Sequence, residues 1–151
     1  MVAVVQRVAN ASVTIDHVVR AEIGRGLLIL LGVRVGDTAA DADALAAKCA
    51  GLRIFEDDAG KMNLSAEAIG GSLLVVTNFT LCGDCSHGKR PSFDGAERPE
   101  KAKPLTERFI AKCAETGLPV RHGEFGADMK VALLNDGPIT LIIDSADLAK
   151  K

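Results

Sequence analysis

The stretch Leu27-Leu28-Ile29-Leu30-Leu31-Gly32-Val33 decides the fold. An extended chain with this sequence is apolar on both faces, so other parts of the protein must cover each side of it. Gly24-Arg25-Gly26 indicates a turn immediately before the stretch. We therefore predict a central strand of a layered or barrel-like sheet, with the rest of the chain arranged around it.

The remaining strands are predicted from runs of β-branched and apolar residues bounded by turn residues. A second buried strand follows the glycine pair at 70–71 and ends where polar side chains begin. In addition to the central strand, strands are predicted at residues 2–8, 11–15, 53–55, 72–77, 131–134 and 139–143.

Two main helices are predicted. Thr38 begins the first, because Asp41 three residues on has the spacing of a capping box, and Gly51 ends it. The second has apolar residues four apart, a proline in its first turn and a glycine after its end, which are Leu105, Phe109, Cys113, Pro104 and Gly117. The predicted fold is a single α+β domain over residues 1–151, in which antiparallel β-sheets form a barrel-like layer flanked by two main helices.

Composition narrows the functional classes. A chain of 151 residues with 48% hydrophobic and 25% charged residues can close one core. No apolar run reaches the roughly 20 residues of a membrane helix, and residues 1–7 lack the features of a signal peptide, so we expect a cytoplasmic protein without a membrane partner. The net charge of -2 and the absence of Trp and Tyr mean that any nucleic-acid contact must be local.

The cysteines leave three interpretations open. Cys82 and Cys85 form a C-x-x-C pair, which can be unremarkable loop cysteines, zinc ligands or a redox pair. A zinc site would need a second ligand pair, but Cys49 and Cys113 occur singly on predicted helices. A redox pair would need a helix that begins at Cys82, where none is predicted. We therefore expect reduced thiols and no metal, with a non-catalytic zinc- or RNA-binding module as the alternative function.

Conventional catalytic motifs do not occur. His17, His87 and His122 lie in polar segments outside any nucleophile elbow or metalloprotease motif, and we interpret them as surface residues. The chain also lacks a G-x-G-x-x-G or Walker-type phosphate loop. A dehydrogenase, an NTPase and any nucleotide cofactor are therefore disfavoured, and no cofactor is expected.

Three segments remain as candidates for function. Thr77-Asn78-Phe79-Thr80 places polar side chains where a buried strand stops, which a polar strand end would equally explain. Asn135-Asp136-Gly137-Pro138 fits a hairpin turn, although a proline directly before a strand removes a ladder hydrogen bond. The region 82–99 reads as a long irregular loop, and loops of that length are usually functional or mobile.

Eight short motifs, in this order along nearly the whole chain, carry a family resemblance. They are Gln6-Arg7-Val8 with Ala11-Ser12-Val13, Gly24-Arg25-Gly26-Leu27-Leu28, Leu31-Gly32-Val33, Arg53-Ile54-Phe55 with Gly60-Lys61-Met62-Asn63, Gly71-Ser72-Leu73-Leu74-Val75-Val76, Arg90-Pro91-Ser92-Phe93, Ala127-Asp128-Met129 and Asn135-Asp136-Gly137-Pro138-Ile139-Thr140. With them the chain resembles the D-aminoacyl-tRNA deacylase family of the bacterial type, also called D-tyrosyl-tRNA deacylase.

Two motifs define the active site of that family, Ser-Gln-x-Thr and Asn-x-Gly-Pro-x-Thr. The second is intact here from Asn135 to Thr140. In the first, Thr77 replaces Ser and Asn78 replaces Gln, while Thr80 agrees. Threonine keeps the hydroxyl, but Asn78 is one methylene shorter than Gln, so a hydrogen bond into the site is lost or made through water. This departure bears on the magnitude of activity more than on its type.

The resemblance implies a chiral proofreading hydrolase of translation. Such an enzyme cleaves the ester of D-aminoacyl-tRNA, and of glycyl-tRNA mischarged on tRNA-Ala, and rejects L-aminoacyl-tRNA. Backbone N–H groups around Phe79 and Thr80 would stabilise the oxyanion, so no triad is needed. Either the Thr80 hydroxyl or the ribose 2'-hydroxyl of the terminal adenosine would carry the proton, and the sequence leaves both open.

The resemblance also implies a homodimer. In it the Gly137-Pro138 turn of one chain enters the other chain's active site, where a cis peptide aims its carbonyls at the substrate's α-ammonium. Phe125 and the loop from Arg90 to Phe93 would lie near the terminal adenosine, with Met129 lining the pocket, although Phe125 and Met129 also suit a core. The implied catalytic residues are Thr77, Asn78, Phe79 and Thr80, and the implied substrate-binding residues are Asn135, Gly137, Pro138, Thr140, Phe125, Met129, Arg90, Pro91 and Phe93.

Overall fold

The computed structural model describes residues 1–149. Its strands are β1 (Val2–Ile15), β2 (Val18–Ile23), β3 (Gly26–Gly32), β4 (Phe55–Glu56), β5 (Met62–Leu64), β6 (Ser72–Thr77), β7 (Val120–His122) and β8 (Lys130–Asp144). Its helices are α1 (Ala39–Ala50), the 3-10 helix η1 (Phe79–Cys82), α2 (Pro99–Ala114) and α3 (Ser145–Leu148). No helix within residues 1–149 has the length and apolarity needed to cross a membrane.

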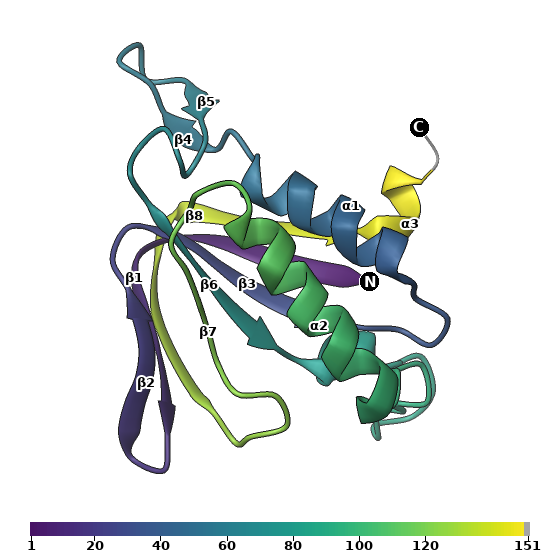
Figure 1. Cartoon of the computed structure of the whole chain (residues 1–151). Helices are drawn as coiled ribbons and strands as arrows, with labels where there is room; N and C mark the ends of the chain where they lie inside the picture. Colours follow the sequence, from purple (N-terminus) through teal and green to yellow (C-terminus); the bar gives the residue numbers. More distant parts are fainter. Residues whose placement is uncertain (150–151) are drawn as a thin grey trace.

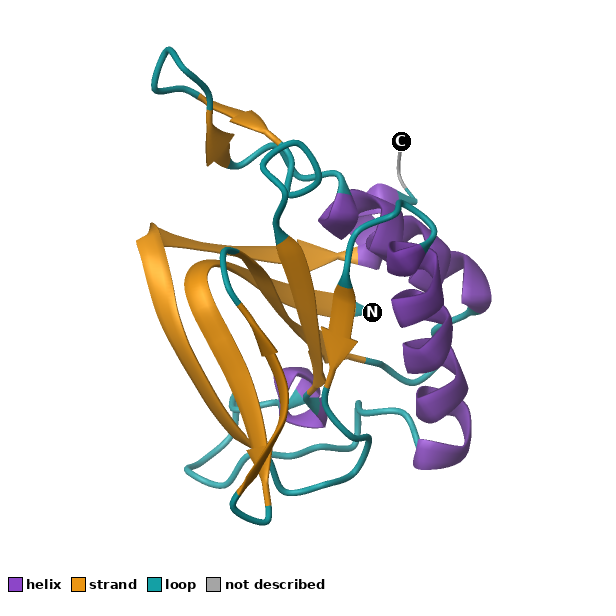
Figure 2. Cartoon of the chain, turned by 60° about the vertical axis from the view of Figure 1, so that its left-hand side comes forward, coloured by secondary structure: helices purple, strands orange, loops and turns teal. Residues whose placement is uncertain are grey.

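The main sheet is strongly curved and mixed. Its strands follow the order β2-β1-β3-β6-β7, and β8 pairs with the other edge of β1. β1 is antiparallel to β2, β3 and β8, whereas the pairs β3–β6 and β6–β7 are parallel. The parallel pairs arise because α1 and α2 each carry the chain back over one face of the sheet (Figures 1 and 2). The α+β prediction of a barrel-like layer with two main helices is confirmed, but the sheet is not wholly antiparallel.

The predicted central strand is β3, and it is covered on both sides. Leu27, Ile29 and Leu31 face a core that includes residues of α1 and α2. Leu28 lies on the opposite face, in a second core that includes Leu74 of β6 and residues of β1 and β2. All five side chains are buried. Since a strand alternates its side chains between faces, this two-sided core is what an unbroken apolar strand requires.

The first helix begins as predicted, and the second begins earlier. Thr38 caps α1, with its N–H donating to the Asp41 carboxylate at 2.8 Å, and Gly51 is its C-cap. α2 begins at Pro99, so the prediction that Pro104 lies in the first turn was wrong. Proline suits the first position of a helix because that N–H has no partner there. Pro104 is instead accommodated inside α2, and the irregular loop ends at residue 98.

Two strand boundaries were also wrong. Residues 2–8 and 11–15 form one strand, β1, which pairs with β3 along its first half and with β2 along its second. Its other edge pairs with β8 throughout. The strand predicted at 53–55 is reduced to Phe55, which pairs with Leu64 of the small β4–β5 arm. Arg53 instead donates from Nε to the Asn63 carbonyl at 2.8 Å.

The segments 131–134 and 139–143 likewise belong to one strand, β8, and not to a hairpin. Val8 pairs with Asn135 and Gln6 pairs with Thr140, so two steps along β1 match five along β8. Residues 136–139 therefore bulge out of the ladder opposite the single residue Arg7. The peptide bond between Gly137 and Pro138 in this bulge is cis.

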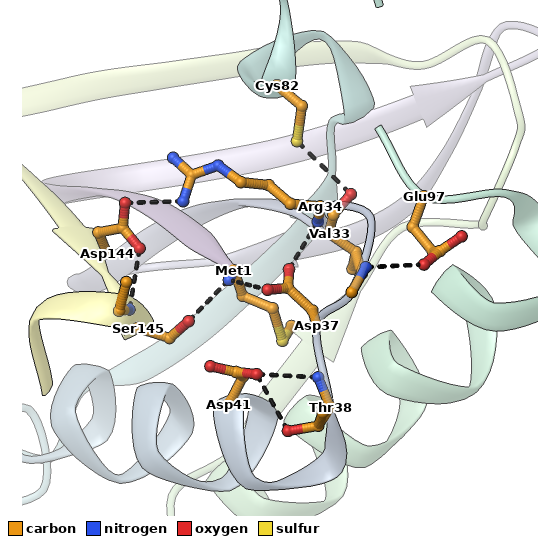
Figure 3. A network of polar contacts seen from close by, with 12 residues as sticks. Met1, Val33, Arg34, Asp37, Thr38, Asp41, Cys82, Glu97, Asp144 and Ser145 are labelled. Atoms are coloured by element: carbon orange, nitrogen blue, oxygen red, sulfur yellow. Dashed lines mark hydrogen bonds and ion pairs between the residues drawn. The ribbon is translucent and has the colours of Figure 1, made fainter. Parts of the chain in front are cut away.

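A polar network at the start of β1 ties together three parts of the chain (Figure 3). The Met1 α-ammonium forms an ion pair with Asp37 at 2.8 Å and donates to Ser145 Oγ at 2.7 Å. Arg34 forms an ion pair with Asp144 at 2.7 Å. The loop after β3 is thereby fastened to the junction of β8 and α3, which matters because Val33 on this loop lines the cavity described next.

Candidate active site

Two backbone donors lie side by side where β6 ends. The Asn78 N–H donates to the Leu31 carbonyl at 2.8 Å, and the first bond of η1 runs from the Leu81 N–H to the Asn78 carbonyl at 3.2 Å. The N–H groups of Phe79 and Thr80 come between them and have no acceptor within residues 1–149. Adjacent free N–H groups of this kind can bind an oxyanion.

The side chains of this segment are also connected. The Thr80 hydroxyl donates to the Asn78 side-chain carbonyl. The Asn78 amide nitrogen is left without an acceptor within residues 1–149, so it can donate to a bound molecule. The hydroxyl, one amide donor and two backbone donors therefore share one short stretch of chain.

A cavity of about 580 Å³ opens beside these groups. Five residues predicted for the site line it: Thr77, Asn78, Phe79, Phe125 and Met129. Its walls are formed mainly by apolar side chains of β3, β6, the segment 125–131 and α2. The structure thus brings these five residues together, although they come from separate parts of the chain.

The Gly137-Pro138 bulge lies elsewhere in the same chain. Along β1, Ala3 pairs with Leu31 beside the cavity, whereas Arg7 pairs with Leu27 opposite the bulge. Four residues of strand separate the two points by about 13 Å. In Figure 1, β8 bends at the upper left, while the teal segment after β6 lies at the lower right. One chain therefore does not bring its own bulge to its own cavity.

Arg7 fixes the bulge and is a functional candidate that sequence reasoning missed. It is only 7% exposed, and it donates from Nε to the Asp136 carbonyl at 3.1 Å and from Nη1 to the Ile54 carbonyl at 2.8 Å. An Asp136 carboxylate oxygen lies 3.6 Å from Nε. The sequence feature that could have revealed this role is a cation within an otherwise apolar strand. Such a residue is buried only when its charge is paired.

The side chains of Asn135 and Thr140, which flank the bulge, form hydrogen bonds within their own chain. The Asn135 amide donates to the carbonyls of Arg7 at 3.0 Å and Ile139 at 2.9 Å, closing the base of the bulge. Thr140 Oγ1 accepts a hydrogen bond from Gln6 at 3.3 Å. These two predicted substrate-binding residues thus shape the bulge, in which Gly137 and Pro138 are exposed.

The loop residues divide into two groups. The Phe93 ring meets the Phe79 ring edge-on, with centroids 5.4 Å apart, so the loop contacts the segment that carries the free N–H groups. Arg90 and Pro91 lie on the exposed part of the loop and outside the cavity lining. Reasoning from the sequence also did not identify Ala102 and Thr106 of α2 as site residues, although both line the cavity. Only helix packing against the sheet places them there, and no local motif indicates it.

We expect that Asn78→Ala lowers kcat/KM about five- to twentyfold, since Ala removes the acceptor of the Thr80 hydroxyl and leaves it unpaired. Asn78→Gln keeps the amide and should keep or raise activity. Steady-state kinetics of ester hydrolysis, on the D-aminoacyl-tRNA substrate that the family resemblance implies, measure both variants. Unchanged kinetics in Asn78→Ala would mean that backbone donors alone form the oxyanion site.

We expect activity to survive strong chelators and thiol-blocking reagents. Within residues 1–149 no three His, Cys, Asp or Glu side chains gather closely enough to hold a metal. Burial raises the pKa of Cys113 to about 12, and it raises the pKa of Cys49 and Cys82 as well, so thiolates are scarce at these positions. Mass spectrometry should find Cys85, the exposed cysteine, alkylated first. Loss of activity on chelation, restored by zinc, would contradict this expectation.

Free oxyanion donors, a neighbouring hydroxyl and a cavity are the parts that an ester hydrolase requires. The model of the family described as D-Tyr-tRNA(Tyr) deacylase matches residues 4–144. The chain belongs to this family.

Known relatives agree with this membership, and two solved structures share the fold. Proteins named D-aminoacyl-tRNA deacylase are 57% identical in Geobacter sulfurreducens, over 96% of this chain and 95% of that one, and 57% identical in Roseiflexus castenholzii, over 97% and 93%. The solved structure titled c-Myc DNA Unwinding Element Binding Protein has a TM-score of 0.89 at 36% identity, covering 95% of this chain and 98% of that one. A probable eukaryotic D-amino acid tRNA deacylase shares the fold, with a TM-score of 0.78 at 16% identity over 95% and 98%.

Proposed function

We propose that this protein, as a single deacylase domain, hydrolyses the ester of D-aminoacyl-tRNA in the cytoplasm and releases a D-amino acid and tRNA. The observation that carries the proposal is the pair of free N–H groups of Phe79 and Thr80 at a cavity that contains Thr77 and Asn78. The named relatives support the substrate class. They favour hydrolysis over the alternative of a non-catalytic zinc- or RNA-binding module.

Hydrolysis of this ester requires mainly that its carbonyl is placed beside the free backbone N–H groups. Water adds to the ester carbonyl, and the N–H groups of Phe79 and Thr80 stabilise the resulting oxyanion, a contribution of roughly 3 kcal/mol per donor. The intermediate then expels the ribose oxygen, which takes up a proton. Either the Thr80 hydroxyl, held by Asn78, or the neighbouring 2'-hydroxyl of the ribose carries that proton.

The site is completed by a second copy of the chain. The bulge at Gly137-Pro138 lies about 13 Å along β1 from its own cavity, so a partner must supply it. Among the described strands β8 pairs only with β1, and it exposes apolar side chains, including Ile142 at 76% and Leu134, as a buried homodimer interface would. In this dimer the carbonyls of Gly137 and Pro138 contact the substrate α-ammonium.

A backbone wall of this kind selects chirality by exclusion. Carbonyl groups packed against the α-carbon leave room for hydrogen and none for an L side chain. D-Aminoacyl groups therefore enter, L-aminoacyl groups are rejected, and glycine, which has no side chain, passes. Glycyl-tRNA mischarged on tRNA-Ala is accordingly a second substrate in this proposal.

The other half of the substrate is the terminal adenosine of tRNA. The cavity walls include Phe125 and Met129, and the loop with Arg90, Pro91 and Phe93 borders the same segment through the Phe93–Phe79 contact. Only the acceptor end need be held, which suits a protein with a net charge of -2.

The test compares one tRNA charged with the D or the L form of the same amino acid. We expect D-aminoacyl- and glycyl-tRNA to be hydrolysed at least about a hundredfold faster than L-aminoacyl-tRNA, because steric rejection of an L side chain costs several kcal/mol. Release of labelled amino acid, corrected for spontaneous hydrolysis, gives each rate. Equal rates on the two enantiomers would refute chiral selection.

A further inference from the structure

The loop between η1 and α2 has a constrained tip, residues 84–93, that lies outside the cavity lining. Asp84 and Ser92 bridge its ends with two backbone hydrogen bonds, of 2.7 and 2.9 Å. The loop is also fastened near its base, where the Glu97 N–H donates to the Val33 carbonyl at 2.9 Å. The tip is therefore a closed and held hairpin, although it has no regular strand.

The charge of this tip opposes that of the whole protein. It contains Lys89 and Arg90, and its one acidic residue is Asp84 at its base. The side chains of Lys89 and Arg90 are exposed, and neither forms an ion pair with an acidic residue of the described chain. A protein with a net charge of -2 thus presents two unpaired cations, Lys89 and Arg90, on this tip.

Two exposed aromatic rings, those of Phe79 and Phe93, connect this loop to the cavity. Phe79 is 59% exposed and Phe93 is 40% exposed, with ring planes at 76° to each other. A Cβ at Gly83 would lie 2.9 Å from the Phe93 ring, so the missing side chain lets the ring pack against the backbone there. Phe79 also lines the cavity, so the aromatic pair is continuous with the active site.

We propose, building on the proposed deacylase function, that this tip binds the single-stranded nucleotides that precede the terminal adenosine. The base next to the adenosine stacks on the Phe79–Phe93 pair, and Lys89 and Arg90 contact the phosphates upstream. Flat rings beside unpaired cations are the combination that single-stranded nucleic acid requires. The cavity can hold the terminal nucleoside, and the tip extends recognition beyond it.

The experiment measures kcat/KM on a ladder of substrates: D-aminoacyl-adenosine, D-aminoacyl-cytidylyl-adenosine and D-aminoacyl-CCA. For the wild type we expect the CCA substrate to exceed the nucleoside by about tenfold or more. Phe93→Leu keeps an apolar side chain against Gly83 but removes the stacking ring. It should lower the ratio of CCA to nucleoside about five- to thirtyfold, the loss typical of one stacked base. An unchanged ratio would overturn the stacking assignment.

A charge variant tests the phosphate contact independently of the ring. Lys89→Gln should reduce the slope of log(kcat/KM) against log[salt] on the CCA substrate by about 0.7, as expected for one lost contact to a single strand. Lys48→Gln, an equal change of charge on α1, is the matched control and should leave the slope unchanged. Equal slopes in Lys89→Gln and the wild type would overturn the contact.

Binding separates failure of this inference from failure of the proposed function. An uncharged RNA hairpin with a single-stranded CCA end is compared by fluorescence anisotropy with the same hairpin lacking that end. If the wild type hydrolyses none of the substrates but prefers the CCA hairpin, and Phe93→Leu loses the preference, the subsite stands while the reaction fails. If the wild type hydrolyses the nucleoside and does not distinguish the hairpins, the subsite fails while the reaction stands.

Discussion

A mixture of two inactive variants is expected to recover about a quarter of the wild-type activity. The first variant, Asn78→Ala with Thr80→Ala, removes the polar side chains beside the free backbone N–H groups. The second, Gly137→Val with Pro138→Ala, damages the bulge. The first homodimer lacks the Thr80 hydroxyl and the Asn78 amide, and the second lacks the native bulge. The two are mixed once kcat/KM of each homodimer is measured at about a hundredfold or more below the wild type. Gly137 has a φ of +131°, and a Cβ there would lie 2.8 Å from Ile139 Cγ1, so valine must displace the bulge.

The recovery follows from sharing of the site between chains. Random reassembly after joint unfolding makes about half of the dimers mixed. Each mixed dimer has one site built from two intact parts and one doubly damaged site, so about a quarter of all sites regain function. Native mass spectrometry verifies the mixed dimers, and each variant refolded alone is the control. Mixed dimers without recovered activity would show that each chain completes its own site.

Gly26→Ala is expected to destabilise the fold by about 3 kcal/mol, whereas Gly24→Ala, two residues away, should change stability by less than about 0.5 kcal/mol. A Cβ at Gly26 would lie 1.9 Å from the Ser72 carbonyl oxygen, and backbone cannot move aside as a flexible side chain can. β3 and β6 would have to separate where their parallel pairing begins. At Gly24 a Cβ meets nothing within 4 Å.

Thermal unfolding of both variants measures the difference. For a domain of this size, about 3 kcal/mol corresponds to a fall in Tm of roughly 6–12 °C. Far-UV circular dichroism at low temperature checks that Gly26→Ala still folds. Equal melting temperatures for the two variants would contradict the close approach of β3 and β6 at this point.

The central strand and the start of the first helix could be predicted because their signals are local. An apolar run such as Leu27–Leu31 has to be covered on both faces whatever its neighbours are, and the Thr38–Asp41 spacing is satisfied within one turn. Strand ends were less predictable. The two halves of β8 looked like a hairpin because a turn sequence separates them, and only pairing with β1 shows that they continue one strand.

The candidate site divides in the same way. The sequence by itself determined the chemical groups of the two motifs, because hydroxyl and amide side chains at the end of an apolar strand, and a glycine before a proline, can be read directly. The sequence also shows Arg7 within an apolar strand, but it does not show that Arg7 binds the bulge through the Asp136 carbonyl. The tertiary structure decided that Phe125 and Met129 share a cavity with Thr77, and that the Gly137-Pro138 bulge lies far from it. Such relations depend on strand register and helix packing between residues distant in the chain, and no local pattern specifies them.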